Sequence, residues 1–174
     1  MAPLAFASHV QIAERRFRER AGLDFEEFEV GQLFKHRPGL TISQQDNAEE
    51  ALDTLNQAMV HYDARYAART EWGKPLVVST LTIQRVVGMT SKTFGKRART
   101  LGFAEITLTH PVFGGDTLYA ETEVRDTRDD GDPSIGRLGL LIRGVNQDGA
   151  VVCALHWEIE VYKRAALPFT EGGY

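Results

Sequence analysis

The chain has 174 residues, of which 43% are hydrophobic and 25% charged, and its formal net charge at pH 7 is −4. These values fit one globular domain and exclude a disordered chain. The longest apolar runs, such as residues 151–155, are far too short to span a membrane. The net negative charge argues against general binding of nucleic acids.

The start of the chain and its cysteine give no sign of secretion. The first seven residues lack the basic segment and the long apolar segment of a secretory signal, so we expect a cytoplasmic protein. Cys153 is the only cysteine. It lies in an alternating apolar pattern, which predicts a small buried hydrophobic residue rather than a nucleophile.

We expect three parts along the chain: an N-terminal arm (1–22), a single domain (23–164) and a C-terminal tail (165–174). The arm is rich in arginine, permits a helix and ends at Gly22. The domain begins with a turn around Gly31, followed by a short strand that the pair Pro38-Gly39 is expected to end.

Residues 43–59 carry the pattern of an amphipathic helix. Apolar residues recur there at helical spacing: Ala48, Ala51, Leu52, Leu55, Ala58 and Met59. Ser43 is the expected N-cap, and Asp46 in the first turn favours the positive end of the helix. Asp63 is expected to cap a second, short helix that residues 73–75 terminate.

A longer helix is predicted within residues 76–89. Its apolar side chains cover much of the circumference: Leu81, Ile83, Val86, Val87 and Met89. Such a helix is expected to be surrounded by a sheet. Ser79 or Thr80 stands at the expected N-cap, where backbone N–H groups without an intrahelical acceptor can point at a ligand.

The last third of the chain alternates with period two. Four strands are predicted, as consecutive antiparallel strands joined by hairpins: 101–108, 118–124, 138–145 and 151–161. Helices followed by long strands predict an α+β domain, and one apolar helix wrapped by a curved antiparallel sheet is a hot-dog fold. Pairing of two sheet edges would hide unpaired backbone groups, so we expect at least a homodimer.

Several motifs occur in an order that resembles the MaoC-like, or R-specific hydratase 2, branch of the hot-dog superfamily, over about residues 25–162. They are Phe-Glu-Val-Gly at 28–31, Pro-Gly-Leu-Thr-Ile-Ser at 38–43, Asp46, His-Tyr-Asp at 61–63 and Pro-Val-Phe-Gly-Gly-Asp-Thr-Leu at 111–118. The resemblance implies addition of water to a trans-2-enoyl-CoA, or its removal, without a metal or redox cofactor. The sequence around these motifs is similar to that of a narrower group within the family. Members of this group hydrate branched C5 dicarboxylyl thioesters such as mesaconyl-, methylfumaryl- or itaconyl-CoA.

The resemblance also implies the site. The family places an Asp and a His in one loop, and carrying that loop over without gaps puts His61 on the histidine and Asn56 on the aspartate. The oxyanion donor would be the amide of Ser79 or a neighbour such as Thr80. His61 would carry the proton, and Asn56, which does not titrate, would orient the water through its carbonyl.

Each assignment has a structural alternative. His61 can be a buried or interfacial histidine bonded to the backbone, and Asn56 can end a helix in a non-helical conformation. Two carboxylates could replace the missing one. Asp53 is expected one helical turn before Asn56 on the same face, whereas Asp46 lies about three turns away.

Cationic side chains mark two further candidate sites. Arg85 on the apolar helix could bind the distal carboxylate of a dicarboxylyl substrate, or emerge at the rim of a dimer. The run Lys92, Lys96, Arg97 and Arg99 could bind the phosphates of coenzyme A, or form a solvated helix end. The remaining histidines show no metal-ligand spacing, so no metal site is predicted: His9, His36, His110 and His156.

Three functions compete. The first is an acyl-CoA hydratase or dehydratase with His61 as acid and base. The second is a hot-dog thioesterase, which would need an acidic residue on or beside the central helix, and residues 77–89 contain none. The third is a non-catalytic acyl-CoA-binding or regulatory protein that kept the fold and lost the carboxylate at Asn56.

Overall fold

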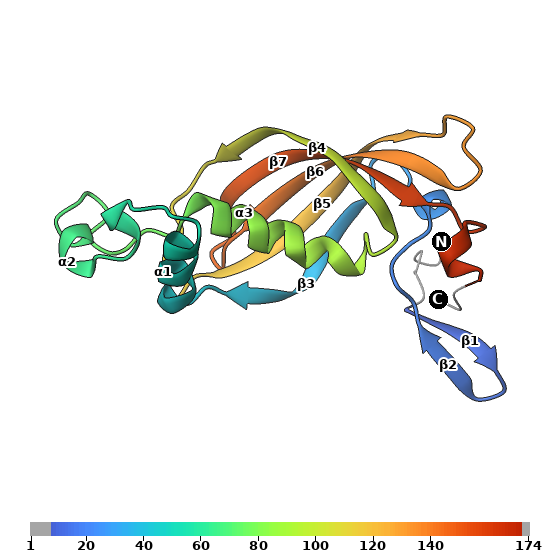
Figure 1. Cartoon of the computed structure of the whole chain (residues 1–174), viewed down its shortest axis with the longest axis horizontal. Helices are drawn as coiled ribbons and strands as arrows, with labels where there is room; N and C mark the ends of the chain where they lie inside the picture. The colour runs from blue at the N-terminus through green and yellow to red at the C-terminus, as the bar shows by residue number, and fades with distance from the viewer. Residues whose placement is uncertain (1–7, 172–174) are drawn as a thin grey trace.

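The computed structural model describes residues 8–171. Within this range a five-stranded antiparallel sheet lies against a central helix, α3 (Ser79–Gly88), as Figure 1 shows. The strand order is β3-β5-β6-β7-β4. The strands are β3 (Leu33–Thr41), β4 (Arg97–Leu108), β5 (Thr117–Arg128), β6 (Ile135–Val145) and β7 (Val151–Tyr162). The predicted α+β hot-dog fold is confirmed.

Alternation of apolar residues produces the core between the sheet and α3. Every second residue of β6 is buried, including Leu138, Leu140 and Ile142. The next inward position is Gly144, where a Cβ atom would lie only 2.6 Å from Cγ2 of Val86. The glycine therefore lets α3 approach β6 more closely than any side chain would permit.

The predicted meander is correct for β5, β6 and β7 but wrong for β4. β4 pairs with β7 at the edge opposite β3, so residues 109–116 cross from one side of the sheet to the other instead of forming a hairpin. Along this path Val77 N donates to Val112 O at 2.9 Å, and Gly115 N donates to Ile42 O at 2.8 Å. Alternation predicts that a segment is a strand, but it does not select its neighbour.

β3 continues through Pro38-Gly39 to Thr41, so the predicted end of this strand is also wrong. The register with β5 shifts between His36 and Leu40. The proline and glycine therefore lie in an irregular part of an edge strand, where a missing ladder hydrogen bond is tolerated.

The helix predicted over residues 43–59 is shorter in the structure. α1 (Gln44–Asp53) begins as expected, because Ser43 Oγ accepts from Asp46 N at 2.9 Å. It ends before Leu55, which has φ 57°. The predicted end near Met59 is wrong, since the later apolar positions do not cover the core: Leu52, Leu55 and Met59 are exposed. A single helical turn, η2 (Met59–His61), follows.

Beyond η2, Asp63 caps α2 (Ala64–Ala67) by accepting from Tyr66 N at 2.9 Å, which confirms the predicted cap. The other short elements are η1 (Phe25–Glu27), η3 (Met89–Lys92) and η4 (Leu167–Phe169). Among residues 8–171 no helix is long and apolar enough to cross a membrane.

The N-terminal arm forms a β-hairpin where the sequence permitted a helix. β1 (His9–Ala13) and β2 (Arg16–Glu19) pair with each other and project from the body at the C-terminal end of α3 (Figure 1). Gly22 follows the hairpin with φ 102°, and a Cβ there would lie 2.7 Å from Gly95 N. The start of the arm (1–7) and the end of the tail (172–174) lie outside the described residues.

Candidate active site

His61 lies at the end of η2, beside the segment that leads into α3. Its Nδ1 donates to the carbonyl oxygen of Leu76 at 2.8 Å. Since a carbonyl oxygen only accepts, Nδ1 carries a proton, and in the neutral form of the ring the lone pair is on Nε2. No group within residues 8–171 bonds to Nε2. The ring is half-buried and can take a proton from a water molecule at this nitrogen.

Two side chains of α1 hold the backbone of His61. Gln44 Nε2 donates to His61 O at 2.9 Å, and Asn47 Nδ2 donates to the same oxygen at 2.8 Å. Asn47 is fully buried. Sequence reasoning gave Asn47 no role, although an asparagine four residues before Ala51 on the inner face of a helix was a usable signal.

The N-cap of α3 is Val78, one or two residues before the predicted position, so Ser79 and Thr80 are the first two helical residues. The amide of Val78 donates to Asn47 Oδ1 at 2.8 Å. The amides of the first helical turn have no acceptor within the helix. Ser79 and Thr80 are exposed, so these amides stand where an anionic oxygen can be bound.

A groove of about 260 Å³ lies beside the first turn of α3. Its lining includes Leu76, Ser79 and Thr82 together with residues 108–112. The groove therefore adjoins Leu76, the residue that holds the imidazole of His61. His61 itself is not among the residues that line the groove.

Asn56 does not contact His61 through a hydrogen bond in the described part of the chain. Its side-chain Oδ1 accepts from Ala58 N at 3.1 Å, and its backbone N–H donates to Ala51 O at 2.8 Å. These bonds close the turn that follows α1. The expected position of Asp53 on the same helical face as Asn56 is wrong, because α1 ends at Asp53.

Arg85 belongs to α3, one turn beyond the buried residues Leu81 and Thr82. Its Nε is buried and has no hydrogen-bond partner among residues 8–171. A buried donor without a partner is uncommon in folded proteins and needs an explanation. Within residues 8–171, Arg85 Nε is thus a buried donor that lacks an acceptor.

The four cations expected to bind coenzyme A do not converge. Lys96 is buried and donates to Asp24 Oδ1 at 2.5 Å, which argues against a phosphate role. Arg99 forms an ion pair with the buried Glu160. The guanidinium of Arg97 lies 4.8 Å from the centre of the Trp157 ring.

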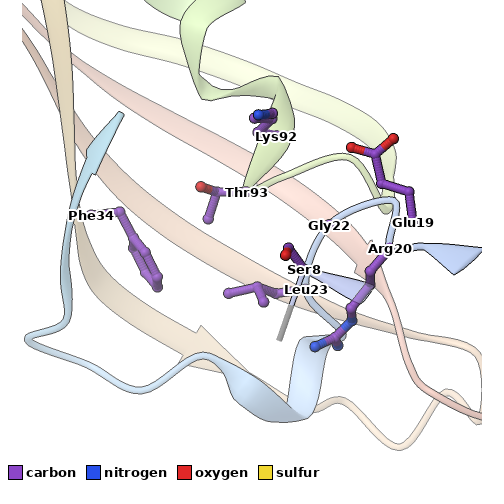
Figure 2. Close-up of a pocket in the computed structure, with 8 residues that line it drawn as sticks. All are labelled: Ser8, Glu19, Arg20, Gly22, Leu23, Phe34, Lys92 and Thr93. Carbon is purple, nitrogen blue, oxygen red and sulfur yellow. The ribbon is translucent and has the colours of Figure 1, made fainter. Parts of the chain in front are cut away.

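Lys92 lines a different cavity, of about 230 Å³, where the N-terminal hairpin meets η3 (Figure 2). Phe34 and Thr93 lie across this cavity from the hairpin, and Arg20 enters it from the other side (Figure 2). Arg20 is already bound to Asp24 at 2.9 Å. Because η3 follows the C-terminus of α3, this cavity lies at the opposite end of the helix from His61.

In the described chain, no cluster of three or more His, Cys, Asp or Glu side chains could hold a metal ion. Cys153 is buried in the core as predicted, and burial raises the pKa of its thiol. A neutral buried thiol is a poor nucleophile.

Comparison with known proteins places this geometry in a family. Residues 25–139 match the model of the MaoC-like domain. Over 154 residues the chain is 29% identical to the mesaconyl-CoA hydratase of Cereibacter sphaeroides, covering 87% of this chain and 45% of that protein. The chain thus spans less than half the length of this curated relative.

Two solved structures show the same fold. The unliganded (R)-hydratase of Pseudomonas aeruginosa is 25% identical, with a TM-score of 0.66 over 82% of this chain and 88% of that one. A Mycobacterium tuberculosis protein with a double hot-dog fold is 21% identical, with a TM-score of 0.74 over 83% of this chain and 46% of that one. With the family model matching most of the domain, the chain belongs to the MaoC-like domain family.

Proposed function

We propose that this chain is an enoyl-CoA hydratase, which adds water across the C2=C3 bond of an enoyl-CoA thioester or removes it in the reverse direction. The observation that carries the proposal is the bond from His61 Nδ1 to Leu76 O. It orients a basic nitrogen, Nε2, with its lone pair free. The family, the hydratase relative and the (R)-hydratase structure support the same activity.

In the proposed reaction Nε2 of His61 takes a proton from water while the oxygen forms a bond to C3. The electrons of the double bond move to the thioester oxygen, which becomes an enolate. Amides of Ser79 and Thr80 bind that oxygen, and the imidazolium then returns a proton to C2. Asn56 orients the water through the second lone pair of Oδ1.

We further propose a branched C5 dicarboxylyl substrate, with Arg85 as the partner of the distal carboxylate. A guanidinium binds both oxygens of a carboxylate and so supplies the partner that Nε lacks. The mesaconyl-CoA hydratase relative acts on a substrate of this class by its name.

The exposed edge of β4 supports a homodimer. Four large apolar residues there are between 40% and 49% exposed: Leu101, Phe103, Ile106 and Leu108. β4 is an edge strand, so its outer backbone groups can pair with a second copy. Sedimentation equilibrium of the full chain is expected to give a dimer, and Ile106→Asp is expected to weaken it; a monomeric wild-type chain would contradict this proposal.

The activity is tested with the purified full chain and crotonyl-, mesaconyl- and itaconyl-CoA, following loss of the absorbance of the conjugated thioester. His61→Ala is expected to lower kcat/KM by about a hundredfold or more, since general acid–base catalysis supplies that much. His156→Ala is the matched control, because His156 is exposed on β7, its Nε2 lies 3.4 Å from the carboxylate of Glu105, and it does not line the groove beside α3.

Three results would count against the hydratase. More than a tenth of the activity retained by His61→Ala would exclude His61 as the proton carrier. Tight acyl-CoA binding without turnover of any substrate would favour the non-catalytic binding protein. Release of free coenzyme A thiol, measured with a thiol reagent, would favour the thioesterase.

A further inference from the structure

The buried amide of Asn47 makes hydrogen bonds to three backbone groups around the site, one in η2 and two in the segment that leads into α3. Its Nδ2 donates to His61 O at 2.8 Å and to Leu76 O at 3.0 Å, and its Oδ1 accepts from Val78 N at 2.8 Å. Its side chain is fully buried within α1. Every polar group of the amide is therefore used, and each bond joins α1 to a part of the candidate active site.

Two of these bonds hold backbone oxygens next to the imidazole of His61. Leu76 O accepts both from Asn47 Nδ2 at 3.0 Å and from His61 Nδ1 at 2.8 Å. Asn47 thus fixes the acceptor that determines which ring nitrogen of His61 carries the proton. It also holds the backbone oxygen of His61, so the ring and its attachment point are restrained by the same residue.

The third bond reaches the opposite part of the proposed site. Val78 is the N-cap of α3, and the amides of Ser79 and Thr80 follow it directly. The valine side chain has no oxygen with which to cap the amides of the first turn, and its own amide donates to Asn47 Oδ1 of α1. Asn47 therefore sets the distance between the base and the proposed oxyanion donors.

We propose that Asn47 is a positioning residue. It fixes the Nδ1-protonated form of His61 and holds the ring at a fixed distance from the N-terminus of α3. The proposal rests on the hydratase function proposed above. Only an amide of this length supplies two donors and an acceptor in one plane. Aspartate keeps the acceptor for Val78 N but has no donors for the two carbonyl oxygens, and leucine has neither.

Displacement of a catalytic group by about 1 Å can reduce the rate about a hundredfold. We therefore expect Asn47→Asp and Asn47→Leu to lower kcat by about ten- to a hundredfold, with KM for the acyl-CoA changed less than about threefold. Thr122→Val is the matched control. Thr122 is also fully buried, and its hydroxyl bonds to His36 Nε2 at 2.8 Å, while Nδ1 of the same ring contacts Thr93, which follows η3 beyond the C-terminus of α3.

A second measurement does not depend on turnover. The ¹⁵N chemical shifts of the His61 ring report which nitrogen is protonated, and a His61→Ala spectrum assigns its signals. Wild-type protein and Thr122→Val are expected to show the proton on Nδ1. Both Asn47 variants are expected to shift toward protonation on Nε2, because the shared acceptor is no longer held.

The two measurements separate the two proposals. If the wild-type chain hydrates no substrate but the Asn47 variants alter the His61 ring, the hydratase proposal fails and the positioning role stands. If the ring is unchanged in both variants and kcat falls no more than in Thr122→Val, the positioning role is wrong. Thermal unfolding of all variants identifies any that do not fold, and Asn47→Asp, which keeps one of the bonds, remains informative if Asn47→Leu unfolds.

Discussion

The ammonium group of Lys96 donates a 2.5 Å hydrogen bond to Asp24 Oδ1, although 72 positions separate the two residues in the sequence. Both side chains are buried, and Arg20 binds the other carboxylate oxygen of Asp24 at 2.9 Å. Burial raises the pKa of Asp24, but the hydrogen bond from Lys96 and the charges of Lys96 and Arg20 outweigh it, so the pKa lies below its ordinary value. This cluster joins the N-terminal arm to the sheet.

Asp24→Asn is expected to lower the free energy of unfolding by about 3–5 kcal/mol, because it leaves the buried ammonium of Lys96 without a counter-charge. Urea denaturation followed by circular dichroism measures the change. Asp126→Asn is the control, since Asp126 pairs with Arg128 at the surface, where such pairs contribute at most about 1 kcal/mol. Equal losses in the two variants would show that the cluster adds no stability of its own.

His36 is expected to make the fold sensitive to mild acid. Its ring is buried and bonds to Thr122 Oγ1 at 2.8 Å, and burial, followed by the nearby charge of Arg37, lowers its pKa from 6.5 to about 4. The unfolded chain binds a proton at His36 below pH 6.5, whereas the folded chain does so only near pH 4. The free energy of unfolding should therefore fall as the pH drops from 6.5 to 4, by up to about 3 kcal/mol.

Denaturation curves recorded between pH 4 and 8 test this expectation. His36→Gln removes the titration and keeps a polar group for Thr122. Its free energy of unfolding should be lower than that of the wild type at pH 8, but its dependence on pH between 4 and 6.5 should be flatter. The same slope in both proteins would assign the acid sensitivity to other groups. His9→Gln is the control, because that residue is exposed in the N-terminal hairpin.

Substitutions of Asn56 separate its turn-closing bond from its proposed chemistry. Asn56→Asp keeps an acceptor for Ala58 N and for water, so we expect unfolding free energy within about 0.5 kcal/mol of wild type and kcat within about threefold. Asn56→Ala removes Oδ1 and with it the bonds from Ala58 N and from water. It should lower the unfolding free energy by about 1 kcal/mol and kcat by about tenfold. Stopped-flow hydration assays measure kcat. A gain of more than tenfold in Asn56→Asp would mean that the site needs a carboxylate.

Arg85→Lys tests the proposed substrate class. Lysine keeps the charge but cannot bind a carboxylate with two parallel hydrogen bonds. We expect kcat/KM for mesaconyl-CoA to fall about ten- to a hundredfold, and kcat/KM for crotonyl-CoA, which has no distal carboxylate, to change less than about threefold. Arg125→Lys is the control, since Arg125 pairs with Glu123 at the surface of β5. Equal losses for the two substrates would remove Arg85 from the recognition of the acyl group.

The sequence by itself determined the features that depend on local spacing. Alternation marked β5, β6 and β7, apolar coverage marked α3, and Ser43 and Asp63 marked two helix starts. Each of these signals lies within a few residues of the structure that it specifies. The order of the motifs is likewise a property of the linear sequence, and it is sufficient to identify the family.

Tertiary structure decided the features that depend on distant partners. Nothing near β4 in the sequence says that it pairs with β7, and nothing near Lys96 says that Asp24 will neutralise it. The sequence could place Asn47 on the inner face of α1, but only the fold shows that its amide binds His61 O and Leu76 O. Buried polar groups must be satisfied by whatever the fold places beside them, and that choice depends on how the whole chain packs.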